Sequence, residues 1–355
     1  MRRKSQFING GSRQPPSLPL EIIELISDFL FTLRPPEHSG NVENETICCV
    51  KPSWNDVKGF MQASPGTHKL GFERWVSVLT IRDSQDWEVA FRISHLIREL
   101  VCLEGTIIPS ESSILARFHR LRAVCVDSHE DVRLAPGSHQ FDYRDVFSSL
   151  PPTVQHLEVK HAHGPDVHVI QCVKRHCPEL ESLWLGRCTV FNRPGCSFWN
   201  SFPLDHDAYI TNRGTDAYAH SLGGALFPLQ SLKSIRLGIY VVPTTVLMHR
   251  LFHTWNLPVP PVVNWQALLE PPPNANQNEQ NSQPQLGQIS DLITLLHRTP
   301  EEEICEQCWQ EFFAGTHSAE ISATRILKER LPSLEWVGWM DWFTPLHLGV
   351  RFYLV

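Results

Sequence analysis

The sequence has no apolar stretch long enough to cross a membrane. A spanning helix needs roughly 20 consecutive apolar residues. The best candidate, residues 239–248, is interrupted by Pro243, Thr244 and Thr245. We therefore expect a soluble chain with no membrane partner.

An excess of basic residues is also lacking. The 31 Lys and Arg are outnumbered by 38 Asp and Glu, so the formal net charge is −7. Binding to nucleic acid depends on a positive surface that neutralises phosphates. We therefore expect no nucleic acid partner. Hydrophobic residues make up 42% of the chain, which is enough to fold most of its 355 residues around a core.

A secretory leader is missing from a sequence that is not poor in cysteine. Ten Cys would suit a disulfide framework, but no apolar segment follows Met1, Arg2, Arg3 and Lys4. Cysteines of intracellular proteins are normally reduced. The sequence therefore predicts an intracellular protein, in the cytoplasm, the nucleus or both, that does not depend on disulfides.

The usual catalytic signatures are absent. There is no G-x-S-x-G elbow, no G-x-x-x-x-G-K-[ST] phosphate loop, no G-x-G-x-x-G and no H-E-x-x-H. Scattered acidic residues can be paired on paper, but a single sequence does not bring them together. We predict that the chain is not an enzyme, with no catalytic residues and no cofactor.

Two groups of potential metal ligands need an interpretation. Cys305 and Cys308 form the one C-x-x-C pair, with His297 and His317 nearby in sequence, but a second Cys pair is missing. A surface helix is therefore favoured over a zinc site. His161, His163 and His168 form the second group, and because Gly164 and Pro165 separate them, a polar turn is favoured. We predict no metal site.

Composition divides the chain into segments. Residues 1–16 carry four basic residues with Gly and Pro pairs, which indicates a disordered leader. Residues 17–60 show apolar residues at helical spacing, including Ile47, Val50, Trp54 and Val57, in a stripe that Pro52 interrupts. Residues 271–288 open with three Pro and are rich in Asn and Gln, which indicates a disordered insertion.

A weak repeat runs through residues 70–355. Its template is apolar-x-x-apolar-x-apolar, in which the last two positions point to one face of a short strand and the first closes the preceding turn. The middle positions advance by 21, 24, 33 and 26 residues before the spacing widens, near the period of leucine-rich repeats. The copies are Val76, Leu79 and Ile81; Leu121, Val124 and Val126; Val154, Leu157 and Val159; Leu180, Leu183 and Leu185; Leu232, Ile235 and Leu237; Leu334, Val337 and Trp339; and a degraded copy at Ile97, Leu100 and Cys102.

The repeat predicts an α/β fold in which a short N-terminal helical unit is followed by an irregular leucine-rich-repeat solenoid. The alternative is ordinary α/β structure with coincidental strand spacing, because a three-position template is permissive. The C-terminal Trp336, Trp339, Trp342 and Phe343 could be binding residues, but a coil that caps the solenoid is favoured.

The N-terminal unit resembles an F-box. The run from Ser17 to Leu30, SLPLEIIELISDFL, has the family's Leu-Pro, Glu and paired aliphatic residues, and the run from Ile47 to Val57, ICCVKPSWNDV, is similar to its second half. The departures are a polar insertion between Leu33 and Asn44, and Pro52. A box of this kind followed by irregular leucine-rich coils is similar to a large set of F-box-like proteins of mushroom-forming fungi.

The resemblance implies a substrate-recruiting subunit of an SCF-type (cullin-RING) ubiquitin ligase. The box would bind a Skp-type adaptor, and through it a cullin scaffold, while the repeats hold an unknown target protein. The alternative is a leucine-rich-repeat interaction scaffold that does not engage a ubiquitin ligase. The residues expected to contact the adaptor are Leu18, Pro19, Ile22, Ile23, Ile26, Leu30, Val50 and Trp54.

Overall fold

A computed structural model of the chain describes residues 18–36, 40–107, 111–134, 141–164, 166–200, 210, 215–243, 245–254 and 304–355. The predicted leader, 1–16, and the predicted insertion, 271–288, lie outside these residues. The chain divides into a helical unit, residues 1–34 and 50–76, and a sheet unit, residues 35–49 and 77–355. Within the described ranges, no helix has the length and apolar content needed to cross a membrane.

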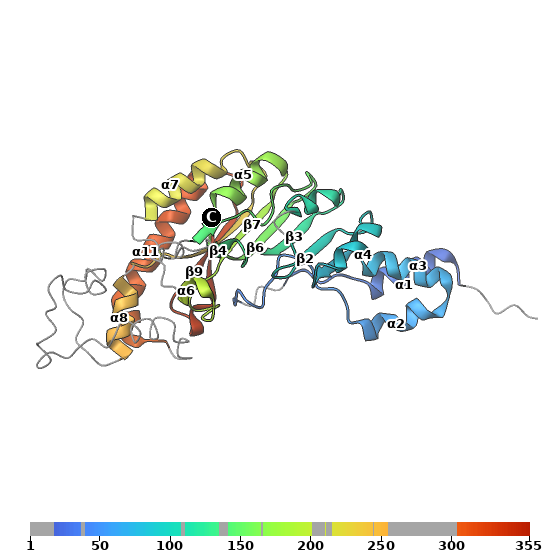
Figure 1. The fold of residues 1–355 in the computed structure, drawn as a ribbon, viewed down its shortest axis with the longest axis horizontal. Helices are drawn as coiled ribbons and strands as arrows, with labels where there is room; N and C mark the ends of the chain where they lie inside the picture. The colour runs from blue at the N-terminus through green and yellow to red at the C-terminus, as the bar shows by residue number, and fades with distance from the viewer. Residues whose placement is uncertain are drawn as a thin grey trace, which may run out of the picture. The chain divides into compact units, whose positions relative to one another are not determined.

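Three helices make up the helical unit: α1 (Leu20–Leu30), α2 (Trp54–Ala63) and α3 (Pro65–Trp75), labelled in Figure 1. Their core is small. Phe31, Val57 and Met61 are buried, and Leu30, Phe60 and Trp75 pack against them. Residues 34 and 50 form an antiparallel bridge where the chain leaves the unit and returns to it.

The helical unit differs from the predicted 17–60 segment in two ways. It continues past Phe60, because Ser64 and Thr67 form a capping box and Pro65 starts α3. The predicted second helix, which was expected to include Ile47 and Val50, is wrong in its first half. Helix α2 begins only at Trp54, after Pro52 and the N-cap Ser53, so neither Ile47 nor Val50 is helical.

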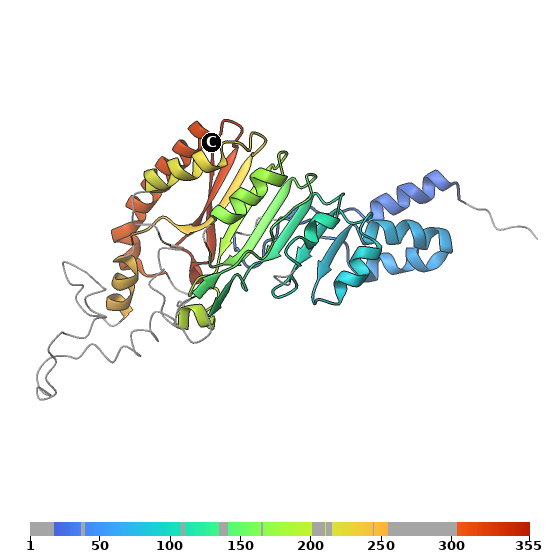
Figure 2. The same ribbon diagram turned by 45° about the horizontal axis from the view of Figure 1, so that its top comes forward.

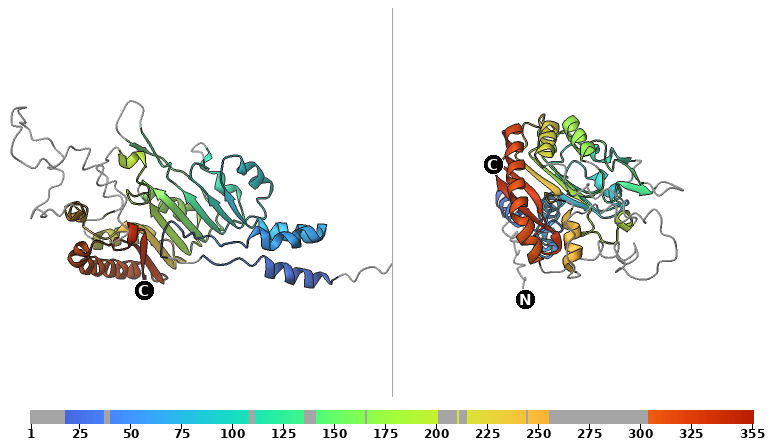
Figure 3. Two further views of the ribbon diagram at one scale, coloured as in Figure 1. Left: turned by 90° about the horizontal axis from the view of Figure 1, so that it is seen from below. Right: turned by 90° about the vertical axis from the view of Figure 1, so that its left-hand side faces the viewer.

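An eight-stranded sheet forms the centre of the sheet unit, and its strands follow chain order. Neighbouring strands from the first to the seventh are parallel, and the last strand is antiparallel to the seventh. Figure 3 shows this succession in the gradual change of colour across the sheet. The strands are β1 (Val78–Ile81), β2 (Glu99–Cys102), β3 (Ala123–Asp127), β6 (His156–Ala162), β7 (Ser182–Arg187), β8 (Ser234–Tyr240), β9 (Trp336–Asp341) and β10 (Gly349–Leu354).

Connecting segments supply the helices. They are α4 (Asp86–Arg92), α5 (Val167–His176), α6 (Ser197–Asn200), α7 (Thr215–Leu226), α8 (Thr245–Thr254) and α11 (Glu306–Arg330), with short 3-10 turns η2 (Ile114–Arg117) and η4 (Pro345–His347). Strands β4 (Val132–Leu134) and β5 (Phe141–Tyr143) pair separately. Helices α5, α7 and α11 cover one face of the sheet (Figure 2), where their apolar residues join the strand residues in the main core.

Every copy of the apolar template is a strand of this sheet, which confirms the strand prediction. The middle positions pair in register across seven strands, from Leu79 and Leu100 to Ile235 and Val337. The copy at Leu100 and Cys102, described above as degraded, forms a strand like the others. The fold is therefore mixed α/β with a large, mostly parallel sheet.

The first template position closes a tight turn, as predicted. The backbone N–H of Leu121, Val154, Leu180, Leu232 and Leu334 each donates to the carbonyl three residues earlier. All five side chains are fully buried in the main core. The same tight turn thus precedes five strands. The apolar residue at this position both closes the turn through its backbone and fills the core with its side chain.

Three of the four C-terminal aromatic residues, Trp339, Trp342 and Phe343, are buried, and Trp336 is half-buried. Trp339 is fully buried in the main core, and its indole N–H donates to Thr324 Oγ1. Trp342 and Phe343 lie in a second apolar cluster, and the ring of Trp336 packs against Phe352. Strand β10 pairs with β9 along its whole length and covers that edge of the sheet.

Candidate functional sites

Helix α1 exposes an apolar surface. Ser27 is its one buried residue, while Leu20, Leu25 and Phe29 leave 60%, 63% and 81% of their surface to solvent. Apolar residues spaced by three, four or seven positions share one side of a helix. A surface of this kind is typical of a helix that binds in a partner's groove.

The residues predicted to contact an adaptor fall into two groups. Leu18, Pro19, Ile22, Ile26, Val50 and Trp54 are exposed, whereas Ile23 and Leu30 are half-buried. Leu30 packs against the core of the helical unit. Leu20, Leu25 and Phe29, which the prediction did not include, are exposed as well.

The face of the sheet opposite the main core is partly covered by residues 40–49. The backbone N–H of Ile47 donates to Glu158 Oε2 of β6 over 2.8 Å, and that of Cys49 donates to Glu99 of β2. Ile47 and Cys48 pack against Ala123, Cys125 and Trp184, which alternate with the core-facing residues of their strands. Residues 47–49, which were predicted to begin the second half of the box, are therefore an integral part of the sheet unit.

A buried ion network fixes this segment to the sheet. The Arg236 guanidinium of β8 donates to Glu45 over 2.7 Å and to Glu158 over 3.2 Å, and both carboxylates are inaccessible to solvent. Arg236 also lies 4.1 Å from the centre of the Trp184 ring. Lys160 donates to the backbone carbonyl of Glu45. These contacts satisfy charges that burial would otherwise penalise strongly.

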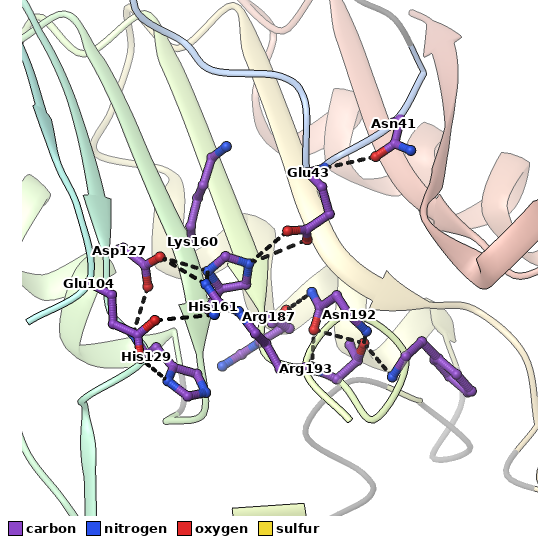
Figure 4. A network of polar contacts seen from close by, with 12 residues as sticks. Asn41, Glu43, Glu104, Asp127, His129, Lys160, His161, Arg187, Asn192 and Arg193 are labelled. Atoms are coloured by element: carbon purple, nitrogen blue, oxygen red, sulfur yellow. Dashed lines mark hydrogen bonds and ion pairs between the residues drawn. The ribbon is translucent and has the colours of Figure 1, made fainter. Parts of the chain in front are cut away.

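A second polar network lies at the carboxyl ends of β3 and β6 (Figure 4). His161 adopts a left-handed backbone conformation, with φ of 53°, and its ring contacts Asp127 Oδ2 at 2.9 Å and Glu43 Oε2 at 3.2 Å. Burial lowers the pKa of His161, but hydrogen bonds to both carboxylates outweigh it and raise the pKa to about 9. The protonated ring therefore joins residues 40–49 to the sheet.

The three histidines predicted to share a polar turn have separate partners. His161 belongs to the network with Glu43 and Asp127. His163 is buried against Asp131 and Cys196, and His168 on α5 makes an exposed ion pair with Asp145. The polar-turn interpretation is thus wrong for His161 and His163, which are buried because their partners come from other strands and loops.

Two clusters of cysteine and histidine occur among the described residues. In the first, potential ligand atoms of His129, His163, Cys188 and Cys196 all lie within 4.8 Å of one another. Interactions with Cys188, and then with His129 and His163, lower the pKa of the Cys196 thiol, whereas burial raises that of Cys188. Sequence reasoning missed this group because its members belong to three different connections.

The second cluster joins His253 to the C-x-x-C pair. His253 Nδ1 lies 3.4 Å from Cys305 Sγ and 3.1 Å from Cys308 Sγ. The sequence spacing had suggested His297 and His317 as partners of this pair. His317 contacts Tyr353 instead, and His297 lies outside the described residues. Cys305 occupies the N-cap position of α11, and Cys308 is buried.

Comparison with known proteins provides no further guide to these sites. No protein-family model, curated protein or solved structure matched the chain.

Proposed function

We propose that the chain is an F-box-like subunit that recruits a target protein to an SCF-type ubiquitin ligase. The observation that carries this proposal is the apolar surface of α1, which is too exposed for a helix that serves only its own core. A Skp-type adaptor would cover that surface and connect the chain to a cullin scaffold. The chain itself would catalyse no reaction.

The division of buried and exposed residues supports this proposal. The helical unit closes its core with Phe31, Val57 and Met61, and it leaves Ile22, Ile26 and Phe29 outside. A handful of residues near the centre of an interface usually dominate binding, and truncating one of them to Ala costs about 2 kcal/mol or more. The same unit therefore has enough apolar surface to anchor a partner without losing its own packing.

For the sheet unit we propose an irregular leucine-rich-repeat solenoid that holds the target. The supporting observations are strands in chain order, a template aligned in register across seven strands, and the recurrent turn before them. The apolar sides of the strands are occupied by the main core. The proposed target surface is therefore formed by loops and by the polar residues that remain accessible around residues 40–49.

The test measures binding of the purified full chain to a purified Skp-type adaptor by calorimetry. The variant Ile22→Ala/Phe29→Ala removes two exposed apolar side chains that lie about two turns apart on one side of the helix. We expect the dissociation constant to rise at least tenfold, since about 1.4 kcal/mol corresponds to a factor of ten. Val89→Ala, which truncates a residue of α4 that is 59% exposed, is the matched control.

Two outcomes would contradict the proposal. One is undetectable binding of the adaptor to the unmutated chain, which would favour a leucine-rich-repeat interaction scaffold that does not engage a ubiquitin ligase. The other is an unchanged dissociation constant for Ile22→Ala/Phe29→Ala with an intact circular dichroism spectrum. In that case the adaptor would bind elsewhere on the chain.

A further inference from the structure

We propose that His129, His163, Cys188 and Cys196 bind a structural zinc ion. The four residues follow the carboxyl ends of three adjacent parallel strands, β3, β6 and β7, so the topology of the sheet brings them to one place. Their ligand atoms lie within 4.8 Å of one another. Two imidazoles and two thiolates are a common ligand set of tetrahedral structural zinc.

The distances suit this coordination. Tetrahedral bonds of about 2.0–2.1 Å to nitrogen and 2.3 Å to sulfur place neighbouring ligand atoms roughly 3.3–3.8 Å apart. His163 Nε2 lies 3.3 Å from Cys196 Sγ. No two of the four ligand atoms lie more than 4.8 Å apart, so none exceeds the tetrahedral range by more than about 1 Å. A zinc ion would therefore draw the loops together by a small movement of side chains.

Both imidazoles are oriented as zinc ligands usually are. His129 Nδ1 donates to Glu104 Oε1 over 2.6 Å, a contact drawn in Figure 4, and His163 Nδ1 donates to Asp131 Oδ1 over 2.8 Å. An ionised carboxylate can only accept, so each ring carries its proton on Nδ1. Each Nε2 is then free to bind a metal, in the carboxylate–histidine–zinc arrangement.

One of the four ligand atoms is buried without a hydrogen bond of acceptable geometry among the described residues. This atom is His129 Nε2. A buried nitrogen acceptor without a partner is unfavourable. Zinc would satisfy it, and the two thiolates would balance the charge of the ion. The indole N–H of Trp199 donates to Cys188 Sγ over 3.2 Å, and such a bond stabilises a thiolate.

The principal alternative is a nucleophilic cysteine activated by histidine. Cys196, His163 and Asp131 do form the required chain of contacts. A nucleophile must reach its substrate, however, and Cys196 and His163 expose only 7% and 2% of their surface. The additional His129 and Cys188 also have no role in such a triad. Burial and a complete set of four ligands therefore favour a closed structural metal site.

The ion would hold together a part of the chain that has little regular structure. Residues 188–196 follow β7 and lead to Phe198 and Trp199, which are buried in the second apolar cluster. Four protein ligands leave no coordination position open, so the site would stabilise the fold and supply no chemistry. This role is independent of the adaptor surface on α1.

The test begins with full-length protein that has been reconstituted with Zn²⁺, dialysed without chelator and analysed by mass spectrometry for bound metal. The unmutated chain should keep zinc at this site, and Cys188→Ser/Cys196→Ser should lose one equivalent. Cys172→Ser/Cys177→Ser replaces two other buried thiols and should keep all of it. Cys305→Ser/Cys308→Ser removes the thiols of the second cluster and should leave the equivalent that depends on Cys188 and Cys196.

Spectroscopy on protein that keeps both Cys188 and Cys196 covers the case in which Cys188→Ser/Cys196→Ser does not fold. X-ray absorption of the zinc-loaded Cys305→Ser/Cys308→Ser protein should give two sulfur and two nitrogen neighbours. Cobalt substitution should give the visible bands of a tetrahedral site with thiolate ligands. An unmutated folded chain that retains no metal would overturn the proposal, as would the loss of all bound metal in Cys305→Ser/Cys308→Ser.

Discussion

The helical unit and the sheet unit treat their polar and apolar groups in opposite ways. The helical unit leaves Leu25 and Phe29 largely exposed, whereas the sheet unit buries Glu45, Glu158 and Arg236. Exposed apolar groups gain free energy only when a partner covers them, while buried charges are tolerated only when they are paired. The comparison therefore contrasts an exposed apolar helix surface with buried, paired charges.

The largest expected difference in stability between the two units comes from replacing one arginine in each of them. Arg236→Ala should lower the free energy of unfolding by about 3–5 kcal/mol, because it removes the guanidinium that pairs with two buried carboxylates, Glu45 and Glu158. Arg74→Ala removes the pair with Asp28, whose carboxylate is 63% exposed, and should cost less than about 1 kcal/mol.

Urea denaturation, combined with hydrogen exchange resolved by peptide, would measure these changes in each unit separately. Multidomain chains need such separation, because one transition does not describe two units. Equal losses for Arg236→Ala and Arg74→Ala would contradict the distinction between buried and exposed ion pairs that underlies this comparison.

A second pair of variants tests the apolar residues. Leu157→Ala removes a fully buried side chain from the main core and should cost about 2–5 kcal/mol, through lost burial and a remaining cavity. Leu25→Ala truncates an exposed residue of α1 and should change stability by no more than about 0.5 kcal/mol. Thermal and urea unfolding of both variants check this prediction. A large destabilisation by Leu25→Ala would mean that α1 packs against the chain itself.

A smaller effect should appear on acidification. Burial, and then the charge of Arg250, lowers the pKa of His347 to about 3. The unfolded chain, with a pKa near 6.5, therefore binds a proton that the folded chain excludes. Stability should fall as the pH drops below 6.5, by about 1.4 kcal/mol per pH unit and roughly 2 kcal/mol at pH 5.

The measurement compares urea denaturation at pH 7 and pH 5 for the unmutated chain and His347→Gln. Glutamine keeps a donor near the carbonyl of Trp342, which His347 Nδ1 now contacts over 2.5 Å, but it cannot titrate. The loss of stability between the two pH values should be smaller in the variant. An identical loss would show that other groups cause the pH dependence.

Local patterns were sufficient to predict several elements. The apolar template predicted the strands because alternation along five or six residues selects one face of a sheet. The same reasoning predicted α1, with its acidic first turn and helical spacing. It did not separate Leu30, which packs against the core of the helical unit, from Phe29, which is exposed. The spacing identifies an apolar side of the helix but does not specify which of its residues face the core.

The sequence by itself therefore determined where the strands lie, which of their residues face the main core, and that the N-terminal unit is helical. Only the tertiary structure decided the course of residues 40–49, where Ile47 contacts a carboxylate 111 positions away. It also decided the meeting of His129, His163, Cys188 and Cys196 from three connections. The physical reason is that secondary structure depends on neighbours along the chain, whereas buried polar partners are selected by proximity in space.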